Sequence, residues 1–145
     1  MVNLKRNYLD KLEFNQIQEK LESFCLTYIG KDLAKELTPS SDKEKVGDML
    51  AETNQAHVLK YRLGNPPITE LPDVTASISM LSLSSTLSAG QLLELAHILK
   101  LARELKKYFF AEIDVSALTI LSQYFNELYN NSGIEETVLQ AIIDE

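Results

Sequence analysis

The feature that most constrains the fold is a set of apolar residues spaced three to four positions apart over residues 88–110. An α-helix advances about 3.6 residues per turn, so this spacing gathers the apolar side chains into one stripe on one face of a helix. Leu93, Ile98 and Leu101 add apolar surface beside the stripe, and we therefore predict a central helix that packs against several others. The stripe itself consists of Leu92, Leu95, Ala96, Leu99, Ala102, Leu105 and Phe109.

Other segments repeat this pattern between start and stop signals. Ser41 with Glu44, Ser88 with Gln91 and Ser132 with Glu135 have the spacing of a capping box, in which side chains satisfy free amides at the start of a helix. Pro39 and the Gly-Asn-Pro-Pro sequence at 64–67 are stop signals, because proline has no amide hydrogen and restricts the residue before it. We predict helices over about residues 13–28, 30–37, 42–63, 88–110, 115–130 and 133–145.

Two segments between these helices have a different pattern. Residues 64–72 contain three prolines and are predicted to be an extended connector. Residues 73–83 combine Ile78 and Leu81 at helical spacing with Ser and Thr residues whose alternation is typical of a strand, and we favour a short helix. Almost nothing else indicates a sheet. We therefore expect an all-α fold, a multi-helix bundle that forms a single helical domain over residues 1–145.

The net charge of −7 belongs entirely to the last quarter of the chain. Residues 1–107 hold 14 basic and 14 acidic residues, whereas residues 108–145 hold seven acidic residues and no Lys or Arg. A protein that binds nucleic acid non-specifically needs cations to displace the counterions of the phosphates. The acidic segment would therefore repel a phosphate backbone, and any nucleic acid would have to contact another face.

Location and redox state are indicated by what the sequence lacks. No run of 18 apolar residues suggests a membrane span, and the first residues show no secretory signal. Cys25 has no second cysteine with which to form an internal disulfide. We expect a cytoplasmic protein with no membrane partner.

Candidate sites for chemistry are few. Gly30-Lys31-Asp32 looks like the end of a phosphate-binding loop, but that motif needs a glycine where Cys25 stands and a hydroxyl residue where Asp32 stands. One Cys and two His residues, His57 and His97, are too few for a structural zinc site. We predict ordinary helix positions for both histidines and a buried, inert thiol for Cys25. The sequence thus predicts no catalytic, cofactor-binding or metal-binding residue.

One basic stripe has two interpretations. Lys100, Arg103 and Lys107 fall on one face of the central helix, with Lys106 beside them. Such a stripe could contact the phosphates of a nucleic acid, although we expect such binding to be weak. Basic residues near the end of a helix also complement its dipole, and we favour this second interpretation because Glu104 and the acidic segment are close in the sequence.

An ordered set of motifs resembles a known family. The chain has a small polar residue, a glycine, two spaced leucines, a proline that ends the turn, an acidic residue that opens the next helix, and a polar-x-x-Ala element. This order resembles the start of the core domain of MutS-family proteins. The matching residues are Thr27, Gly30, Leu33, Leu37, Pro39, Asp42, Glu52, Thr53 and Ala56.

The similarity is greater to the bacterial MutS paralogue subfamily, the second MutS type, which lacks the mismatch-reading N-terminal domain. Segments 11–21, 50–53, 87–109 and 139–145 look like successive elements of that subfamily. The chain departs from it in one place, because residues 66–86 carry no Lys, Arg or Gly where the family has a basic, glycine-rich segment. Any nucleic-acid contact that the family makes there is in doubt for this chain.

The resemblance implies an N-terminal core segment, similar to the core and lever region, of a longer protein. The family's ATPase domain, which holds ATP and Mg²⁺, and its Smr-type nuclease domain would lie outside this chain. Such proteins are dimeric ATPases that engage branched DNA, restrain recombination or act on stalled ribosomes. We expect a non-catalytic segment that packs against the other domains of its own protein and relays the ATPase state. The alternative is a free-standing helical module that binds another protein.

Overall fold

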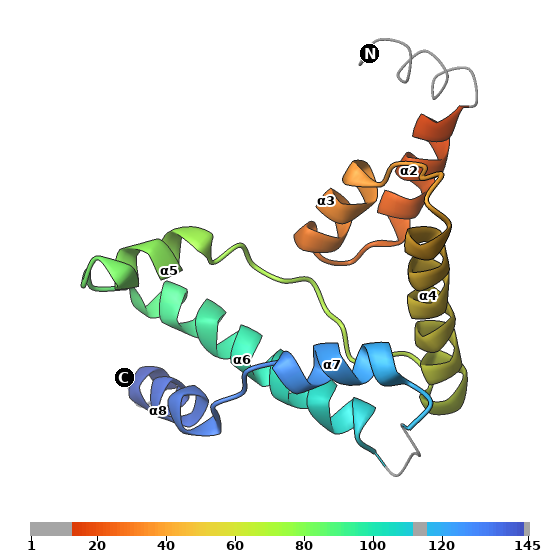
Figure 1. Ribbon diagram of the computed structural model, residues 1–145. Helices are drawn as coiled ribbons and strands as arrows, with labels where there is room; N and C mark the ends of the chain where they lie inside the picture. Colours follow the sequence, from red (N-terminus) through yellow and green to blue (C-terminus); the bar gives the residue numbers. More distant parts are fainter. Residues whose placement is uncertain (1–12, 112–115, 144–145) are drawn as a thin grey trace. The chain divides into compact units, whose positions relative to one another are not determined.

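The computed structural model describes residues 13–111 and 116–143, and every regular element in these ranges is an α-helix (Figure 1). The predicted all-α fold is therefore confirmed. The segment at 73–83, for which helix and strand were both considered, contains a short helix. The described helices are α2 (Phe14–Phe24), α3 (Tyr28–Glu36), α4 (Lys43–Leu63), α5 (Thr75–Ser82), α6 (Ala89–Phe109), α7 (Thr119–Glu127) and α8 (Ser132–Ile143).

The chain divides into two compact units, each with its own packing. The first unit extends to Pro39 and includes Thr69–Leu71, and the second comprises Ser40–Ile68 and the residues from Pro72 onward. Helices α2 and α3 belong to the first unit and α4 to α8 to the second. The single domain over residues 1–145 stays a prediction.

The break between α2 and α3 lies three residues earlier than the sequence predicted. Cys25 and Thr27 both have extended backbone conformations, and the Thr27 hydroxyl accepts a hydrogen bond from the Gly30 amide at 3.1 Å. Thr27 is thus the N-cap of α3, and Gly30 lies inside that helix. The predicted break between residues 28 and 30 is wrong, because a capping threonine starts the second helix before Gly30 is reached.

A close approach explains the glycine at position 30. A Cβ atom there would lie 3.1 Å from the Thr27 hydroxyl oxygen and 3.5 Å from Cys25 Cβ. The capping threonine and the turn around Cys25 therefore occupy the space that a larger residue would need.

Helix α2 turns a polar edge toward α3. The Gln18 amide donates to the carbonyl oxygens of Lys35 and Leu37 at 2.6 and 2.9 Å, which satisfies acceptors at the end of α3. Lys35 also pairs with Glu22 at 3.1 Å. The apolar residues Ile17, Leu21 and Phe24 remain exposed. Ala34 is the one buried residue among those described in this unit.

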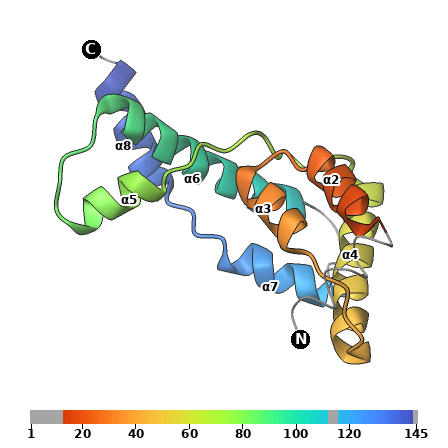
Figure 2. The ribbon, with the colours of Figure 1, turned by 90° about the horizontal axis from the view of Figure 1, so that it is seen from above.

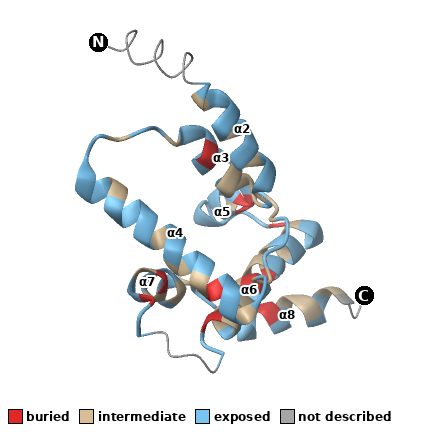
Figure 3. Ribbon diagram, turned by 90° about the vertical axis from the view of Figure 1, so that its right-hand side faces the viewer, coloured by how far each residue is buried: buried red, intermediate tan, exposed pale blue. Residues whose placement is uncertain are grey.

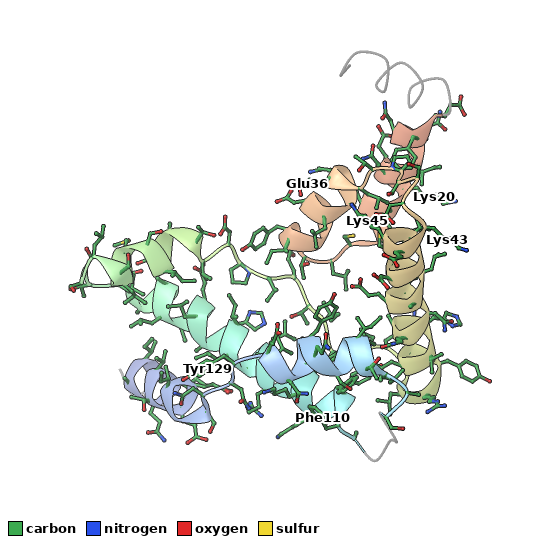
Figure 4. The ribbon with its side chains drawn as sticks, in the orientation of Figure 1. Lys20, Glu36, Lys43, Lys45, Phe110 and Tyr129 are labelled. Atoms are coloured by element: carbon green, nitrogen blue, oxygen red, sulfur yellow. The ribbon has the colours of Figure 1, made fainter. Side chains whose placement is uncertain are left out.

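The hydrophobic core of the second unit lies where α4, α6 and α7 meet (Figure 3). Phe109 is fully buried and stacks on Phe125, with ring centroids 4.2 Å apart. Phe110, at the end of α6, meets Phe109 edge to face and is about half exposed (Figure 4). The other buried members of this core are Leu59, Leu118 and Leu121.

Helices α6 and α8 pack against each other, as Figure 2 also shows. Ala96 and Leu101 are buried on α6. Helix α5 leads through a turn into α6, and the Gln91 amide contacts the Met80 sulfur at 3.7 Å. Val74, Ser77 and Leu87 are buried in this part of the chain.

The helix starts follow capping chemistry, with some differences from the predicted positions. Ser88 and Gln91 form the predicted capping box. For α4, the cap is Asp42 rather than Ser41, because its carboxylate accepts the amides of Glu44 and Lys45 at 3.0 and 3.2 Å. Asn131 takes the capping role at α8, where its side-chain oxygen accepts the Ile134 amide at 3.1 Å.

Helix α7 is shorter than predicted, and helix α8 begins one residue earlier than predicted. Helix α7 covers Thr119–Glu127 instead of 115–130, and its C-cap, Leu128, leaves the helical conformation. Helix α8 covers Ser132–Ile143, and the last two residues of the predicted 133–145 helix lie outside the described residues. Within the described residues, no helix is long and apolar enough to cross a membrane.

Candidate functional site

The most specific polar contact in the second unit joins α6 to α8. Arg103 Nε donates to Glu135 Oε2 at 3.0 Å, and Arg103 Nη2 donates to Glu135 Oε1 at 2.8 Å. This is a two-pronged pair, a geometry that the planar guanidinium group favours. The Glu135 side chain is only 7% exposed and that of Arg103 is 26% exposed. The pair therefore connects two helices with the carboxylate buried and the guanidinium group partly exposed.

The charges around this pair stabilise its ionised form. Hydrogen bonds from Arg103 hold the pKa of Glu135 below its usual value, and the positive charges of Arg103, Lys100 and Lys107 lower that pKa further. In return, the hydrogen bond with Glu135 raises the pKa of Arg103. Burial alone would favour the neutral carboxyl group, so the direction of the Glu135 shift shows that the basic partners outweigh it.

The predicted basic stripe is thus split between two roles. Arg103 is held by Glu135, and Lys106 Nζ donates to the Asn126 carbonyl oxygen near the end of α7 at 3.3 Å. Lys100 and Lys107 have exposed side chains on α6. The structure therefore gives Arg103 and Lys106 positions between helices. A phosphate contact by Lys100, Arg103 and Lys107 stays a prediction.

A second connection joins α4 to α7. The side-chain oxygen of Gln55, on α4, accepts the backbone amides of Ile120 and Leu121 at 3.0 and 3.2 Å. These amides belong to the first turn of α7, where helix geometry provides no partner. Leu118, at the N-cap position, makes no side-chain hydrogen bond. Gln55 therefore caps a helix that is far away in the sequence.

A third connection joins α6 to the end of α4. The Tyr108 hydroxyl donates to the Gly64 carbonyl oxygen at 2.6 Å. Gly64 is the C-cap residue of α4 and has a positive φ of 81°, a conformation that favours glycine. Partial burial raises the pKa of Tyr108, so its hydroxyl stays protonated and able to donate.

The residues that the sequence analysis considered as candidate phosphate-binding, thiol or metal-binding sites occupy positions in helices or in the turns beside them. The Gly30 amide is used by Thr27, and Lys31 and Asp32 continue α3, so this stretch is a helix start and not a phosphate loop. Cys25 is half-buried, not fully buried as predicted, and its thiol donates to the Leu21 carbonyl oxygen at 3.4 Å. His57 and His97 lie on α4 and α6, as predicted. No three potential metal ligands cluster among residues 13–111 and 116–143.

Sequence reasoning missed Gln55 and the buried role of Glu135. The sequence analysis assigned Glu135 to a capping box, although its negative charge is opposite to the positive charge of Arg103. For Gln55, the sequence carries no signal, because Asp114 and Ser116 at the predicted start of the 115–130 helix are themselves capping residue types.

Comparison with known proteins finds relatives that all have the same name. The chain is 33% identical over 134 residues to endonuclease MutS2 of Ruminiclostridium cellulolyticum, a match that covers 92% of this chain and 17% of that protein. It is 32% identical over 142 residues to endonuclease MutS2 of Clostridium botulinum, covering 98% of this chain and 18% of the relative. The protein of the same name from Acetivibrio thermocellus is 33% identical over 135 residues, or 92% of this chain.

The chain spans less than one-fifth of the length of these curated relatives. No family model matches it, and no solved structure matches it either. The match to the relatives nevertheless extends over nearly the whole chain, and it agrees with the resemblance that the ordered sequence motifs indicated. The chain therefore belongs, as a segment, to the family of proteins named endonuclease MutS2.

Proposed function

We propose that this chain is the helical core segment of a longer MutS-like ATPase, in which it has a mechanical rather than a catalytic role. The segment would pack against the lever and ATPase domains of its own protein and relay the state of the ATPase to the clamp that holds the substrate. The observation that carries this proposal is the homology to endonuclease MutS2 over nearly the full chain but under one-fifth of the relatives.

The three side-chain connections support a mechanical role. Gln55, Tyr108 and the Arg103–Glu135 pair each join two different helices, and together they link α4, α6, α7 and α8. Each uses a directional hydrogen bond in addition to apolar packing. Packed helices joined by hydrogen bonds and ion pairs are one kind of network that can couple distant sites energetically.

The longer protein would act in the cytoplasm as a homodimer and would hold ATP and Mg²⁺ in a domain outside this chain. Its substrates would be branched DNA, with suppression of recombination as the outcome, or stalled ribosomes. Nuclease activity would belong to a further domain, in keeping with the name of the relatives. This part of the proposal is supported by family membership and by the sequence resemblance.

Two assays on the purified 145-residue chain test the proposal directly. We expect neither ATP hydrolysis nor DNA cleavage above a buffer control. Turnover in either assay that follows the protein through repeated purification would contradict a purely mechanical role.

The relay itself is tested in the longer protein. Glu135→Gln keeps the shape of the side chain but removes the charge that holds Arg103. We expect ATP hydrolysis without substrate to persist, while its stimulation by substrate falls. Glu136→Gln is the matched control, because Glu136 is the exposed neighbour on the same helix. Equal stimulation in wild type and Glu135→Gln would argue against the relay.

A free-standing protein-binding module is the second candidate, favoured by the large number of exposed apolar side chains on α2, α3 and α5. The length of the reading frame separates the two candidates. A frame that continues past residue 145 into a phosphate-loop motif, G-x-x-x-x-G-K-[ST], supports the ATPase segment, whereas a stop codon there supports the module.

Direct binding of nucleic acid through the basic residues of α6 is a weaker proposal. We expect only weak binding through Lys100, Arg103 and Lys107, lost steeply as salt is added. A double charge reversal, Lys100→Glu with Lys107→Glu, should abolish it without breaking the Arg103–Glu135 pair. Lys43→Glu with Lys45→Glu is the control, on the exposed first turn of α4 (Figure 4). Tight, salt-insensitive binding would contradict this expectation.

A further inference from the structure

Residues 74–93 differ from the rest of the chain in carrying no charge. These 20 residues, which include α5, the following turn and the start of α6, contain no Asp, Glu, Lys, Arg or His. They lie between Asp73 and Glu94 and form the longest uncharged stretch in the sequence. A helix that faces water usually carries charged or polar residues on its outer side, and here only small hydroxyl side chains take that place. Covering this segment would therefore remove no charge from water.

One face of α5 is mostly apolar, but only one end of that face is covered. Val74, Ser77, Ile78 and Leu81 recur every three to four residues and therefore share this face. Val74 and Ser77 are buried, whereas Ile78 is 55% exposed and Leu81 48% exposed. Leu83, in the turn that follows, is 78% exposed. We call Ile78, Leu81 and Leu83 the α5 patch. Apolar residues that gather in this way mark surfaces that bind another segment more often than scattered ones do.

The polar groups of α5 are already hydrogen-bonded within the chain. The Ser79 hydroxyl donates to the Thr75 carbonyl oxygen at 2.9 Å, and the Ser82 hydroxyl donates to the Ser79 carbonyl oxygen at 2.7 Å. In the turn, the amides of Ser84 and Ser85 donate to carbonyl oxygens at the end of α5. Buried polar groups are destabilising chiefly when they lack partners. A dry contact over the α5 patch is therefore compatible with the serine content.

The last described helix ends near the same end of α6 as this patch. Arg103, in the second half of α6, pairs with Glu135, in the first turn of α8. From there α8 runs back along α6 toward the start of α6, as Figure 1 and Figure 2 both show. Helix α5 and its turn lead into that same start of α6. In a longer protein, the residues that follow α8 therefore begin at the end of α6 beside which the α5 patch lies.

We propose that an apolar segment of the same polypeptide, beyond residue 145 of the longer protein, docks on the α5 patch. This inference rests on the proposed function, in which the chain continues into further domains, and the chain spans less than one-fifth of its relatives. A segment tethered near its binding surface has an effective concentration on the order of millimolar, which favours it over a separate molecule. A charged partner would need complementary charges, which the patch does not have, so the docking segment is apolar.

The first test measures whether the patch is covered in the longer protein. Leu83→Cys places a thiol on the patch, and Ala76→Cys is the matched control, because Ala76 is exposed on the opposite face of α5. We expect a maleimide to label position 83 at least about tenfold more slowly than position 76, as for a contact that is open less than about one-tenth of the time. Mass spectrometry of proteolytic peptides measures both rates and separates them from labelling of Cys25. Equal rates, each normalised to the urea-unfolded protein, would overturn the proposal.

The second test asks whether the contact is apolar. Leu81→Glu, combined with the Leu83→Cys reporter, should raise the labelling rate at least about fivefold, because a charge in an apolar contact is strongly unfavourable. Ala76→Glu, combined with the same reporter, should leave the rate unchanged. Circular dichroism should confirm that both variants keep their helix content. A slow rate that Leu81→Glu does not alter would contradict an apolar contact at this face.

The third test identifies what covers the patch and leaves the apolar character of position 83 intact. A photoreactive benzoylphenylalanine in place of Leu83 should give a cross-link to a peptide beyond residue 145, in a product with the mass of one chain. A product of twice that mass would indicate a second copy, and a cross-link to residues 13–39 would indicate the first unit. Either result would overturn the proposal. The proposed function would survive both, because its test by Glu135→Gln does not involve this surface.

Discussion

At the scale of single residues, Phe109 is the side chain on which the core of the second unit depends most. It is fully buried, stacks on Phe125 and contacts Phe110. Phe109→Ala should lower the free energy of unfolding by about 3–5 kcal/mol, through lost burial and the cavity left behind. Chemical denaturation monitored by circular dichroism measures this loss. Phe24→Ala, at an exposed position, should change stability by about 0.5 kcal/mol or less. Similar losses in both variants would contradict the placement of Phe109.

The pair of Arg103 and Glu135 makes stability depend on acidity. Because the pKa of Glu135 is lower in the folded chain than in the unfolded one, the pair stabilises the fold fully above the unfolded pKa, near 4.5. This stabilisation disappears as the pH falls through the lower folded pKa. The wild type should therefore melt at a higher temperature than Glu135→Gln near neutral pH, and the difference should shrink in acid. Glu136→Gln should show no such trend. If the difference in melting temperature between wild type and Glu135→Gln grows as the pH falls, the stabilising role of the ionised pair is contradicted.

At the scale of helices, α7 depends on a residue of α4 for its first turn. Gln55→Ala removes the acceptor of two amides and should cost about 1 kcal/mol, as the loss of an N-cap does. Gln55→Glu should retain most of the stability, because a carboxylate also accepts these amides and favours the positive end of the helix dipole. Gln123→Ala, on the exposed side of α7, is the control. If Gln55→Ala proves as stable as Gln123→Ala, the cap has no energetic role.

The helices also show how far local sequence determines structure. The ends of α4 and α6 were predicted to within about a residue, because Ser88, Gln91 and Gly64 act on atoms a few positions away. The break before α3 was misplaced because Thr27 caps this helix, so the helix begins before Gly30 is reached. The outward direction of Ile17 and Phe24 could not be predicted, since periodicity defines a face and not what covers it.

The candidate site was predicted only in part, because the spacing of residues along one helix does not show which other helix lies against it. Arg103 and the lysines were identified from their spacing on one helix. Glu135 is 32 residues away and Gln55 is 65 residues from Ile120, so their contacts depend on how the helices pack. Sequence periodicity gives no distances between helices.

At the scale of the whole molecule, the two units differ in how much apolar surface they bury. Among the described residues, the first unit buries only Ala34, whereas the second buries Phe109, Leu59, Leu121 and several others. Amides of α2 and α3 should therefore exchange with solvent faster than those of α6 under native conditions. Mass spectrometry of peptic peptides after timed exchange measures this difference. Equal protection in α3 and α6 would show that the first unit is stabilised by more than its own packing.

The cap that Gln55 provides also has a consequence for the order of folding. Its partner Ile120 is 65 residues along the chain, so α7 gains this hydrogen bond only after a long loop has closed. Helix α6 carries its own capping box and can nucleate locally. We expect the hydrogen bond between Gln55 and Ile120 to form after the rate-limiting step of folding. Gln55→Ala should therefore raise the unfolding rate more than it lowers the folding rate. Helix α7 is then a late element, whose register is set by the assembled partner and not by its own sequence.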